Sequence, residues 1–463
     1  DDPTPHYGIS TGFGALASTR VPRDYRVALQ HSLIRSHAAS TGLRVESEVI
    51  RAMMTLRLKT MASGHTGVRP EVVTAYADLL NSGLVPVVGE YGSLGCSGDL
   101  APLAHCALVL TGEGAVLTPD GDEVDAATGL TQAGLKPVSL REKEGLALIN
   151  GTDGMLGQLI MALADLDVLV PTADLATAMT VQALCGIDRV FAPDLQALRP
   201  HPGQATSAAN ILALLEGSDL IQAGREGAAK RVQDAYSLRC APQVHGAVRD
   251  TMAHALQVAK VELASAVDNP VITDDMRVES NGNFHGAPVA YVLDFLAIAA
   301  ADLASMSERR TDRMLDPARN RDLHPFLADD PGVDSGHMIA QYTQAGIVSD
   351  MKRLAVPASV DSIPTSAMQE DHVAMGWSAA RKLRRAIDGM GAVIGIEIMT
   401  AAKAIQMRGL EPSKPVADVI ERMRQTIPGP GPDRFLAPEI DEAHRLVASG
   451  ELLEVARQSV EVS

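Results

Sequence analysis

The apolar residues of this chain follow a helical spacing over most of its length. Between residues 23 and 81 they recur every three or four positions, as at Ile50, Met53 and Met54, which predicts amphipathic helices. Glycine and proline residues at positions 64–70 interrupt this pattern. We therefore expect a series of helices in this region rather than one.

Three longer helices are expected in the second half of the chain, at residues 249–267, 288–309 and 366–408. The last contains no proline, and at about 1.5 Å per residue it would extend for roughly 65 Å. Ser366 and Gln369 form a capping box at its start. Because helices of this length have no partner in a small domain, we expect a bundle shared between subunits.

These patterns predict a mainly α fold. We expect an N-terminal domain at residues 1–150, a central bundle of long helices at residues 151–408, and a small helical C-terminal region at residues 409–463. The segment 116–140 is rich in glycine, aspartate, threonine and proline, so we expect a loop there with a short strand or helix at most. Aromatic residues make up only 3 % of the chain, which favours helix packing over strands.

The composition narrows the class of protein. The 463 residues are 46 % hydrophobic and 21 % charged, which is ordinary for a soluble globular protein. The net charge of −17 argues against nucleic acids and anionic membranes as partners. The apolar run 155–170 is broken by Asp165 and Asp167, so we expect that no segment spans a membrane.

The four cysteines, Cys96, Cys106, Cys185 and Cys240, have neither the spacing of a metal site nor the density of a disulfide framework. We therefore expect a cytoplasmic location. None of the thirteen histidines lies in a His-Glu-x-x-His pattern, and no metal is expected. The chain starts abruptly in a polar turn, so we expect that residues which normally precede Asp1 are missing.

The most unusual chemistry lies in the triplet Cys96-Ser97-Gly98. Gly98 has no Cβ, so its amide nitrogen can approach the carbonyl of Cys96 closely, and the hydroxyl of Ser97 can leave as water. Cyclisation and loss of water would leave a five-membered ring with an exocyclic methylene, which is an electrophile. Asp99 is expected to cap a helix that runs to Gly112, and the positive end of that helix would stabilise negative charge on the ring.

Residues 92–105, fourteen in a row, closely resemble the signature of the aromatic amino acid ammonia-lyases. In that family the triplet matures into 4-methylidene-imidazol-5-one (MIO). The resemblance therefore implies an MIO group formed from Cys96, Ser97 and Gly98, with no metal or diffusible cofactor. A shorter match would favour a glycine-rich turn before a helix. A serine hydrolase elbow is excluded, because Asp99 stands where the Gly-x-Ser-x-Gly motif needs its last glycine.

The opening loop, residues 7–14, also resembles the family, in which it covers the active site. It lacks the Gly-x-Gly-x-x-Gly spacing of a dinucleotide-binding loop. The resemblance implies that Tyr7 is the catalytic base, and to serve as one its phenol must be held partly ionised by nearby positive helix ends. Asn150, in an Asn-Gly-Thr motif, would bind near the ring or the substrate amine; the alternative is a helix-terminus residue.

Two further blocks match the substrate pocket of the family. Arg239 can grip a carboxylate with its planar fork, and Gln233 and Tyr236 precede it in the same block. The alternative for Arg239 is a surface salt bridge. Phe284 belongs to a Gly-Asn-Phe-His segment whose aromatic ring lies against the MIO pocket in the family, and the alternative is a buried core phenylalanine.

Three residues bear on substrate choice. Ser36 and His37 match a pair found in histidine-specific members, and Glu370 stands where those members have glutamate. A histidine and a carboxylate can hydrogen-bond both nitrogens of an imidazole, whereas a phenyl ring would leave a buried carboxylate unpaired. The alternatives are a core histidine and a carboxylate that serves a helix dipole. Two departures from the family pattern are Cys96, where alanine is usual, and Met368, where asparagine is common.

The resemblance covers the chain from Tyr7 to about Arg408 and is closest to the histidine-specific members of actinobacterial type. It implies elimination of ammonia from L-histidine to give trans-urocanate, as a step of histidine catabolism. It also implies a homotetramer whose active sites are shared between subunits. The rival interpretations are a phenylalanine or tyrosine ammonia-lyase or aminomutase with the same MIO group, and a helical binding protein that has lost the chemistry.

Overall fold

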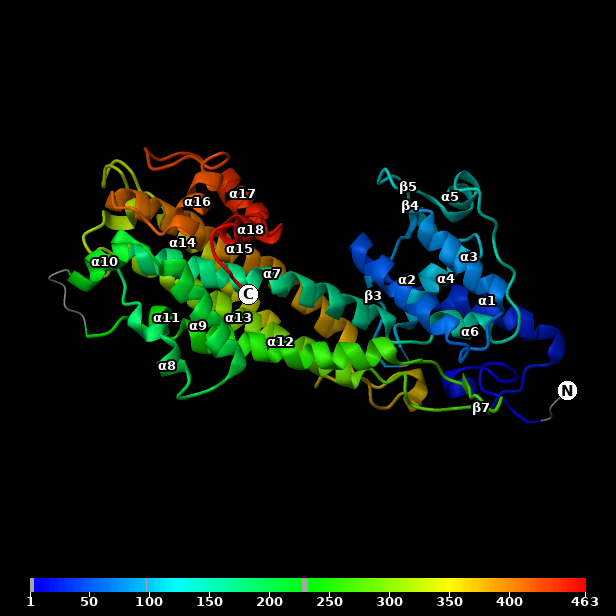
Figure 1. The fold of residues 1–463 in the computed structure, drawn as a ribbon. Helices are drawn as coiled ribbons and strands as arrows, with labels where there is room; N and C mark the ends of the chain where they lie inside the picture. The colour runs from blue at the N-terminus through cyan, green and yellow to red at the C-terminus, as the bar shows by residue number, and fades with distance from the viewer. Residues whose placement is uncertain (1–3, 97, 227–231) are drawn as a thin grey trace. The chain divides into compact units, whose positions relative to one another are not determined.

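The computed structural model describes residues 4–96, 98–226 and 232–463 (Figure 1). The fold is mainly α, as the sequence predicts. The chain divides into two compact units. The first unit consists of Asp1–Met161, Ala255–Asp294 and Pro357–Arg381, and the second consists of Ala162–His254, Phe295–Val356 and Lys382–Ser463. Each unit is therefore built from three separate stretches of the chain.

The first unit contains a set of short and medium helices that pack on one another. They are α1 (Arg26–His37), α2 (Ser47–Ala62), α3 (Pro70–Asn81), α4 (Leu100–Leu110), α5 (Ala126–Gln132) and α6 (Glu144–Ile149), with the 3-10 turns η1 (Gly14–Leu16), η2 (Arg23–Tyr25) and η5 (Ser366–Met368) (Figure 1). α4 packs against both α1 and α6. The predicted apolar positions Ile50, Met53 and Met54 are completely buried, because they lie on the face of α2 that is turned towards the core.

Small antiparallel sheets complete the first unit. β1 (Thr41–Arg44) pairs with β3 (Gly89–Tyr91), and β6 (Val271–Ile272) pairs with β7 (Val278–Glu279). A three-stranded sheet has the order β2 (Val85–Pro86), β4 (Ala115–Leu117), β5 (Glu123–Asp125). The segment expected to be mostly loop therefore holds parts of a hairpin, and α5 follows it, with Asp125 accepting a hydrogen bond from the backbone N–H of Thr128 at 3.0 Å.

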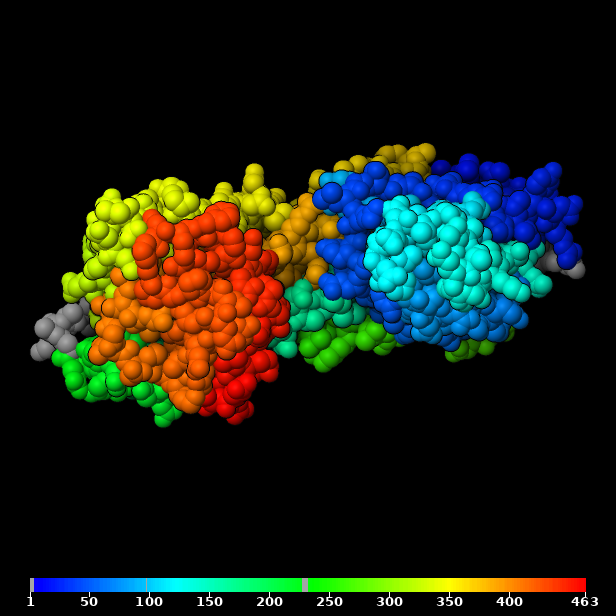
Figure 2. All heavy atoms as spheres, turned by 90° about the horizontal axis from the view of Figure 1, so that it is seen from above, coloured from blue at the N-terminus to red at the C-terminus, as the bar shows by residue number. Residues whose placement is uncertain are grey.

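Four long helices have residues in both units: α7 (Asp153–Ala183), α12 (Ala241–Ala264), α13 (Ala287–Leu315) and α15 (Gly376–Arg408). The second unit adds η3 (Arg189–Phe191), α8 (Pro193–Gln196), α9 (Pro202–Leu215), α10 (Asp219–Glu226), α11 (Tyr236–Arg239), η4 (Pro325–Leu327), α14 (Met338–Leu354), α16 (Lys414–Met423), α17 (Ala437–Ala448) and α18 (Glu451–Arg457). α18 packs on α16 and α17, and Figure 2 shows these C-terminal helices, in orange and red, covering one face of the second unit.

A buried ion pair lies in the core of the second unit. Arg310 of α13 and Glu397 of α15 are both fully buried, and Nε and Nη2 of the arginine donate to the two carboxylate oxygens at 2.5 and 2.8 Å. The hydroxyls of Thr180 and Ser307 donate to the same carboxylate at 2.7 and 2.6 Å. Because every carboxylate oxygen is hydrogen-bonded, the cost of removing these charges from water is offset.

By length and composition alone, α13 and α15 could cross a membrane. In the structure, 61 % of the most apolar window of α13 and 83 % of that of α15 are buried inside the protein. The apolar character of both helices is thus largely used in packing the fold.

The prediction of one helix at residues 366–408 is wrong. α15 begins only at Gly376, so at about 1.5 Å per residue it is roughly 50 Å long. Ser366, Ala367 and Met368 have φ angles of 51°, 50° and 69°, in the left-handed region that L-residues disfavour. The hydroxyl of Ser366 accepts a hydrogen bond from the backbone N–H of Ala15 at 3.2 Å and does not cap a helix. A contact distant in sequence therefore overrides the local capping signal.

Candidate active site in the first unit

A cavity of about 830 Å³ lies in the first unit. Its lining includes seven residues that the sequence singled out, namely Tyr7, Ser36, His37, Cys96, Asn150, Phe284 and Glu370. These residues come from six regions of the chain, which range from the opening loop to the turn before α15. The fold thus gathers most of the predicted site at one cavity.

Gly98 lies against the backbone of the loop between α6 and α7. Gly98 has a φ angle of 78°, and a Cβ added to it would lie 2.3 Å from both the nitrogen and the oxygen of Gly151. The backbone N–H of Asp99 donates to the oxygen of Gly151 at 2.6 Å. Only glycine fits at position 98, so the residues present fit a group whose closure needs a close approach of the Gly98 nitrogen. Ser97 lies outside the described residues.

Asp99 occupies the N-cap position of α4, but its side chain does not cap the helix. Its carboxylate accepts hydrogen bonds from the hydroxyl of Ser93 at 2.7 Å and from the backbone N–H of Met155 at 2.8 Å. The prediction of a capping side chain is therefore wrong, because these two donors compete successfully for the carboxylate. Burial raises the pKa of Asp99 to about 7.

Tyr7 points its hydroxyl at the opening loop itself. The hydroxyl accepts a hydrogen bond from the backbone N–H of Gly14 at 3.0 Å, and the ring stands edge-on to Phe13 with 6.1 Å between centroids. Burial raises the pKa of Tyr7, the charge of Glu370 raises it further, and the single Gly14 donor opposes both. The expectation that positive helix ends hold this phenol partly ionised is wrong within this chain, because burial and a nearby carboxylate dominate.

Ser36, His37 and Glu370 all line the cavity. The hydroxyl of Ser36 lies 3.0 Å from Nδ1 of His37 and donates to the carbonyl of Leu33 at 3.0 Å. Burial lowers the pKa of His37, and the charge of Glu370 opposes this shift. Oε2 of Glu370 accepts a hydrogen bond from the hydroxyl of Thr365 at 2.7 Å. The carboxylate is therefore held by the same turn that contains the strained residues 366–368.

Asn150 brings an unsatisfied acceptor to the cavity. The side chain is buried, and its Nδ2 donates to the carbonyl of Asn269 at 2.8 Å. Its Oδ1 has no hydrogen-bond partner among the described residues. A buried amide oxygen without a donor is costly, so this atom is suited to accept a hydrogen bond from a bound ligand.

The cavity also contains residues that the sequence reasoning did not assign to it. Asn269, Asn281 and His372 line it, and the ring of His372 stacks on that of His285 with 5.8 Å between centroids. The only sequence signal that could have assigned Asn281 and His372 to the site is their nearness to predicted site residues. Asn281 stands three residues before Phe284, and His372 stands two after Glu370.

Gln233, Tyr236 and Arg239 belong to the second unit, and none of them lines this cavity. Gln233 is exposed, and Tyr236 is 70 % exposed. The Arg239 guanidinium lies 4.7 Å above the centroid of the Tyr236 ring, and its Nε donates to the carbonyl of Asp234 at 2.9 Å. The residues of the predicted carboxylate-binding block are thus exposed or partly exposed, and they do not line the cavity of the first unit.

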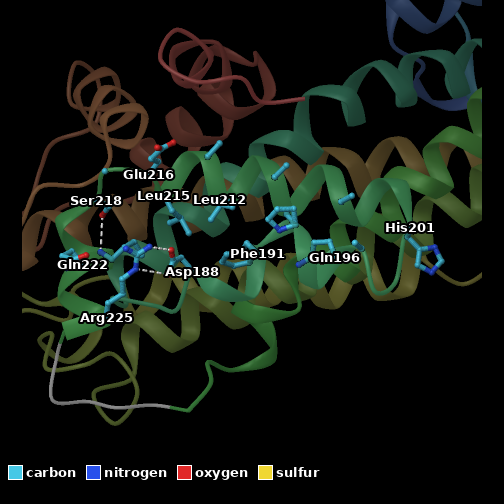
Figure 3. A pocket seen from close by; sticks show the side chains of 18 of the residues that line it. Asp188, Phe191, Gln196, His201, Leu212, Leu215, Glu216, Ser218, Gln222 and Arg225 are labelled. Atoms are coloured by element: carbon cyan, nitrogen blue, oxygen red, sulfur yellow. Dashed lines mark hydrogen bonds and ion pairs between the residues drawn. The ribbon is translucent and has the colours of Figure 1, made fainter.

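A second cavity, of about 1030 Å³, lies in the second unit among η3, α8, α9 and α10 (Figure 3). Its lining is rich in alanine, and several of its polar side chains are engaged with one another or with the backbone. Arg225 pairs with Asp188, and Gln196 hydrogen-bonds the carbonyl of Val190 at 2.8 Å. It contains none of the predicted site residues. In the part of the chain that the structure describes, no group of three His, Cys, Asp or Glu side chains could hold a metal ion.

The family model described as aromatic amino acid lyase matches residues 1–425. The chain belongs to this family. A histidine ammonia-lyase of Streptomyces avermitilis is 64 % identical to it over 456 residues, which cover 98 % of this chain and 89 % of that protein. A histidine ammonia-lyase of Deinococcus radiodurans is 48 % identical over 455 residues, covering 98 % of this chain and 86 % of that protein.

Solved structures of the aromatic amino acid lyase fold are also similar. Histidine ammonia-lyase from Trypanosoma cruzi matches with a TM-score of 0.90 at 38 % identity, covering 98 % of this chain and 85 % of that chain. Tyrosine aminomutase from Streptomyces globisporus matches with a TM-score of 0.92 at 36 % identity, covering 99 % of this chain and 91 % of that chain. The fold is therefore common to proteins with different reactions, and substrate choice has to be argued from the residues of the cavity.

Proposed function

We propose that this chain is a carbon–nitrogen lyase that eliminates ammonia from L-histidine to give trans-urocanate. The observation that carries the proposal is the cavity of the first unit, whose lining brings His37 and Glu370 together with Cys96 of the triplet. The high identity to proteins named histidine ammonia-lyase over nearly the whole chain supports the same substrate.

The proposed electrophile is an MIO group formed from Cys96, Ser97 and Gly98. When formed, it supplies an electrophilic methylene that captures the substrate amine and so makes it a better leaving group. Asn150 lines the cavity, and its Oδ1, which has no hydrogen-bond partner among the described residues, can accept a hydrogen bond from the amine and so orient it. Cys96 contributes its carbonyl, and burial raises the pKa of its thiol to about 12, so the thiol stays protonated beside the electrophile.

His37 and Glu370 select the imidazole ring. A neutral imidazole has one N–H donor and one acceptor nitrogen, and the lowered pKa of His37 keeps its side chain neutral as well. Glu370 can accept from the substrate N–H, while His37 can donate to the other nitrogen. A phenyl ring offers neither group and would leave the half-buried carboxylate with no partner from the substrate in a closed site. The pocket therefore favours histidine over phenylalanine.

We propose that the protein is a homotetramer in which neighbouring copies complete each cavity. Gln233, Tyr236 and Arg239 lie in the second unit and line no part of this cavity. If another copy contributes them, Arg239 can bind the substrate carboxylate with its two-pronged guanidinium. Its positive charge would also lower the pKa of Tyr7, which the present chain alone raises. Tyr7 could then remove the β-proton as a base.

The activity test is the conversion of L-histidine, L-phenylalanine and L-tyrosine, followed by near-ultraviolet absorbance and by identification of the product. We expect trans-urocanate from histidine and at least about a hundredfold lower kcat/KM on the other two amino acids. Activity on phenylalanine or tyrosine alone would contradict the substrate assignment. Recovery of a β-amino acid in place of ammonia would support the aminomutase alternative, to which the structural likeness of the tyrosine aminomutase points.

The shared site can be tested by co-expressing two variants of reduced activity, Glu370→Gln and Arg239→Ala. If different copies supply the two side chains, random assembly leaves about a quarter of the sites with both native residues, and activity returns. No return of activity in mixed assemblies of confirmed composition would contradict the proposal. Each variant assembled alone is the control.

A further inference from the structure

A buried arginine lies directly behind the loop that supports the triplet. Arg57 of α2 has no exposed surface. Its Nη1 donates to the carbonyl of Asn150 at 2.7 Å, and its Nη2 donates to the carbonyl of Val267 at 2.8 Å. One side chain therefore joins α2, the loop after α6 and the loop after α12.

A single layer of main chain separates the guanidinium of Arg57 from Gly98. A Cβ added to Gly151 would lie 2.5 Å from Nη1 of Arg57 and 2.2 Å from Oδ2 of Asp153. A Cβ added to Gly98 would lie 2.3 Å from the nitrogen of Gly151. The guanidinium, the Asn150–Gly151 peptide and Gly98 are thus stacked without room for a methyl group between them. The position of Gly98 depends on where Arg57 holds this peptide.

The hydrogen bonds of Arg57 go to the main chain although carboxylates are available. Its Nε lies 3.5 Å from Oδ2 of Asp153, but neither atom makes a hydrogen bond there. Asp268 is paired instead with Lys143 at 2.6 Å. A guanidinium placed only to neutralise charge would point its fork at a carboxylate. The geometry indicates that the fork is placed to hold the two carbonyls.

The contact has an electrostatic consequence as well. A cation that donates to the carbonyl of Asn150 polarises the peptide it shares with Gly151 and makes the N–H of Gly151 a stronger donor. In a buried site this effect is little screened. The strengthened N–H lies against Gly98.

We propose that Arg57 is a positioning residue for closure of the ring formed by Cys96, Ser97 and Gly98. It holds the Asn150–Gly151 peptide so that this peptide presses Gly98 towards the carbonyl of Cys96. The inference rests on the proposed function, because it concerns formation of the proposed MIO group. It assigns no contact with substrate to Arg57.

The covalent step it assists is balanced without an oxidant. The nitrogen of Gly98 bonds to the carbonyl carbon of Cys96, and the carbonyl oxygen leaves as water with the amide hydrogens of Gly98 and Ser97, which leaves a carbon–nitrogen double bond. The hydroxyl of Ser97 and its Cα hydrogen then leave as a second water. The loss is about 36 Da in total, which intact-protein mass spectrometry resolves.

The test compares two buried arginines in the full-length protein. Arg57→Met removes the fork at the loop, and Arg310→Met removes an equally buried fork whose partners are Glu397 and Ser237 in the second unit. In the soluble, folded fraction we expect most Arg57→Met chains to keep the unmodified mass, with ring content at least tenfold lower than in the wild type. Arg310→Met should lose the full 36 Da (about two waters). Complete mass loss in folded Arg57→Met would overturn the inference.

Arg57→Lys decides the question if Arg57→Met yields no folded protein. Lysine keeps the positive charge, but as a point donor it does not reproduce a fork that reaches two carbonyls. We expect mass loss to be at least tenfold slower after synthesis than in the wild type. Mass loss at the wild-type rate would overturn the inference. An unmodified wild-type chain would contradict the proposed function itself, and with it the ground for assigning a role to Arg57.

Discussion

Arg57 and Arg310 are both completely buried, yet the two units use them differently. Arg310 faces Glu397, whose carboxylate is also satisfied by two hydroxyls, so its charge is matched within a closed network. Arg57 directs its fork at two main-chain carbonyls, and its nearest carboxylate is 3.5 Å away. The comparison teaches that burial of a cation says little about its role. The partners of the donor groups distinguish a side chain that stabilises a core from one that shapes a site.

Among the variants that test this comparison, Gly98→Ala should have the largest effect. The new methyl group would lie 2.3 Å from the backbone of Gly151, and alanine disfavours the φ of 78°, so the ring cannot close and activity should fall at least about a thousandfold. Intact mass and turnover of L-histidine measure this. Gly346→Ala in α14 is the matched control, because its Cβ would meet nothing within 4 Å. It should retain activity and gain about 0.5–1 kcal/mol of stability.

Arg310→Met tests the other half of the comparison, which is the role of the buried arginine in the second unit. It leaves the carboxylate of Glu397 buried without its cation, which should lower the free energy of unfolding by about 3–5 kcal/mol. The double variant Arg310→Met, Glu397→Leu removes both charges and should recover most of that loss. Urea unfolding at one fixed protein concentration gives the comparison. Equal stability of the single and double variants would contradict a charge-matched core.

Glu370→Gln tests whether the first unit recognises the imidazole ring of the substrate through this carboxylate. The amide keeps the shape but replaces a charged acceptor, and hydrogen bonds to charged groups contribute about 1.5–3 kcal/mol. We expect kcat/KM for histidine to fall about 10–100-fold while discrimination against phenylalanine weakens. Full mass loss of about 36 Da in the variant serves as the control that the ring has formed. Unchanged discrimination would mean that Glu370 does not contact the substrate ring.

The last prediction concerns pH and the buried histidine of the second unit. His337 is enclosed near Lys403, Arg434 and Arg424, and burial lowers its pKa to about 3. Above pH 6.5 neither the folded nor the unfolded chain protonates this residue. Below it only the unfolded chain does, so stability falls by about 1.4 kcal/mol per pH unit down to about pH 3. His337→Gln should have a shallower slope in unfolding experiments between pH 6.5 and 5, and an identical slope would refute this assignment.

Much of the fold could be predicted because its causes are local. Apolar spacing predicted the helices around residues 50–54 and the long helices α12 and α13, although their ends differ from those predicted by one to eight residues. The positions of the helix ends depend more on contacts with residues distant in the sequence. Asp99 and Ser366 have side chains that commonly cap helices. In the structure, Asp99 accepts hydrogen bonds from Ser93 and Met155 instead, and Ser366 accepts one from Ala15. Capping depends on which donors the tertiary fold brings within reach, and these lie up to 351 residues away.

The sequence by itself was enough to propose the chemistry, since a Cys-Ser-Gly triplet in fourteen matching residues and the candidates Tyr7, His37 and Glu370 are readable from residue types and order. The tertiary structure alone decided what surrounds them. It put Gly151 against Gly98 and Arg57 behind Gly151, and it showed that burial raises the pKa of Tyr7. The physical reason is that reactivity depends on packing distances and on the charge and solvent around each group. Those quantities arise from segments far apart in the chain, which no local pattern records.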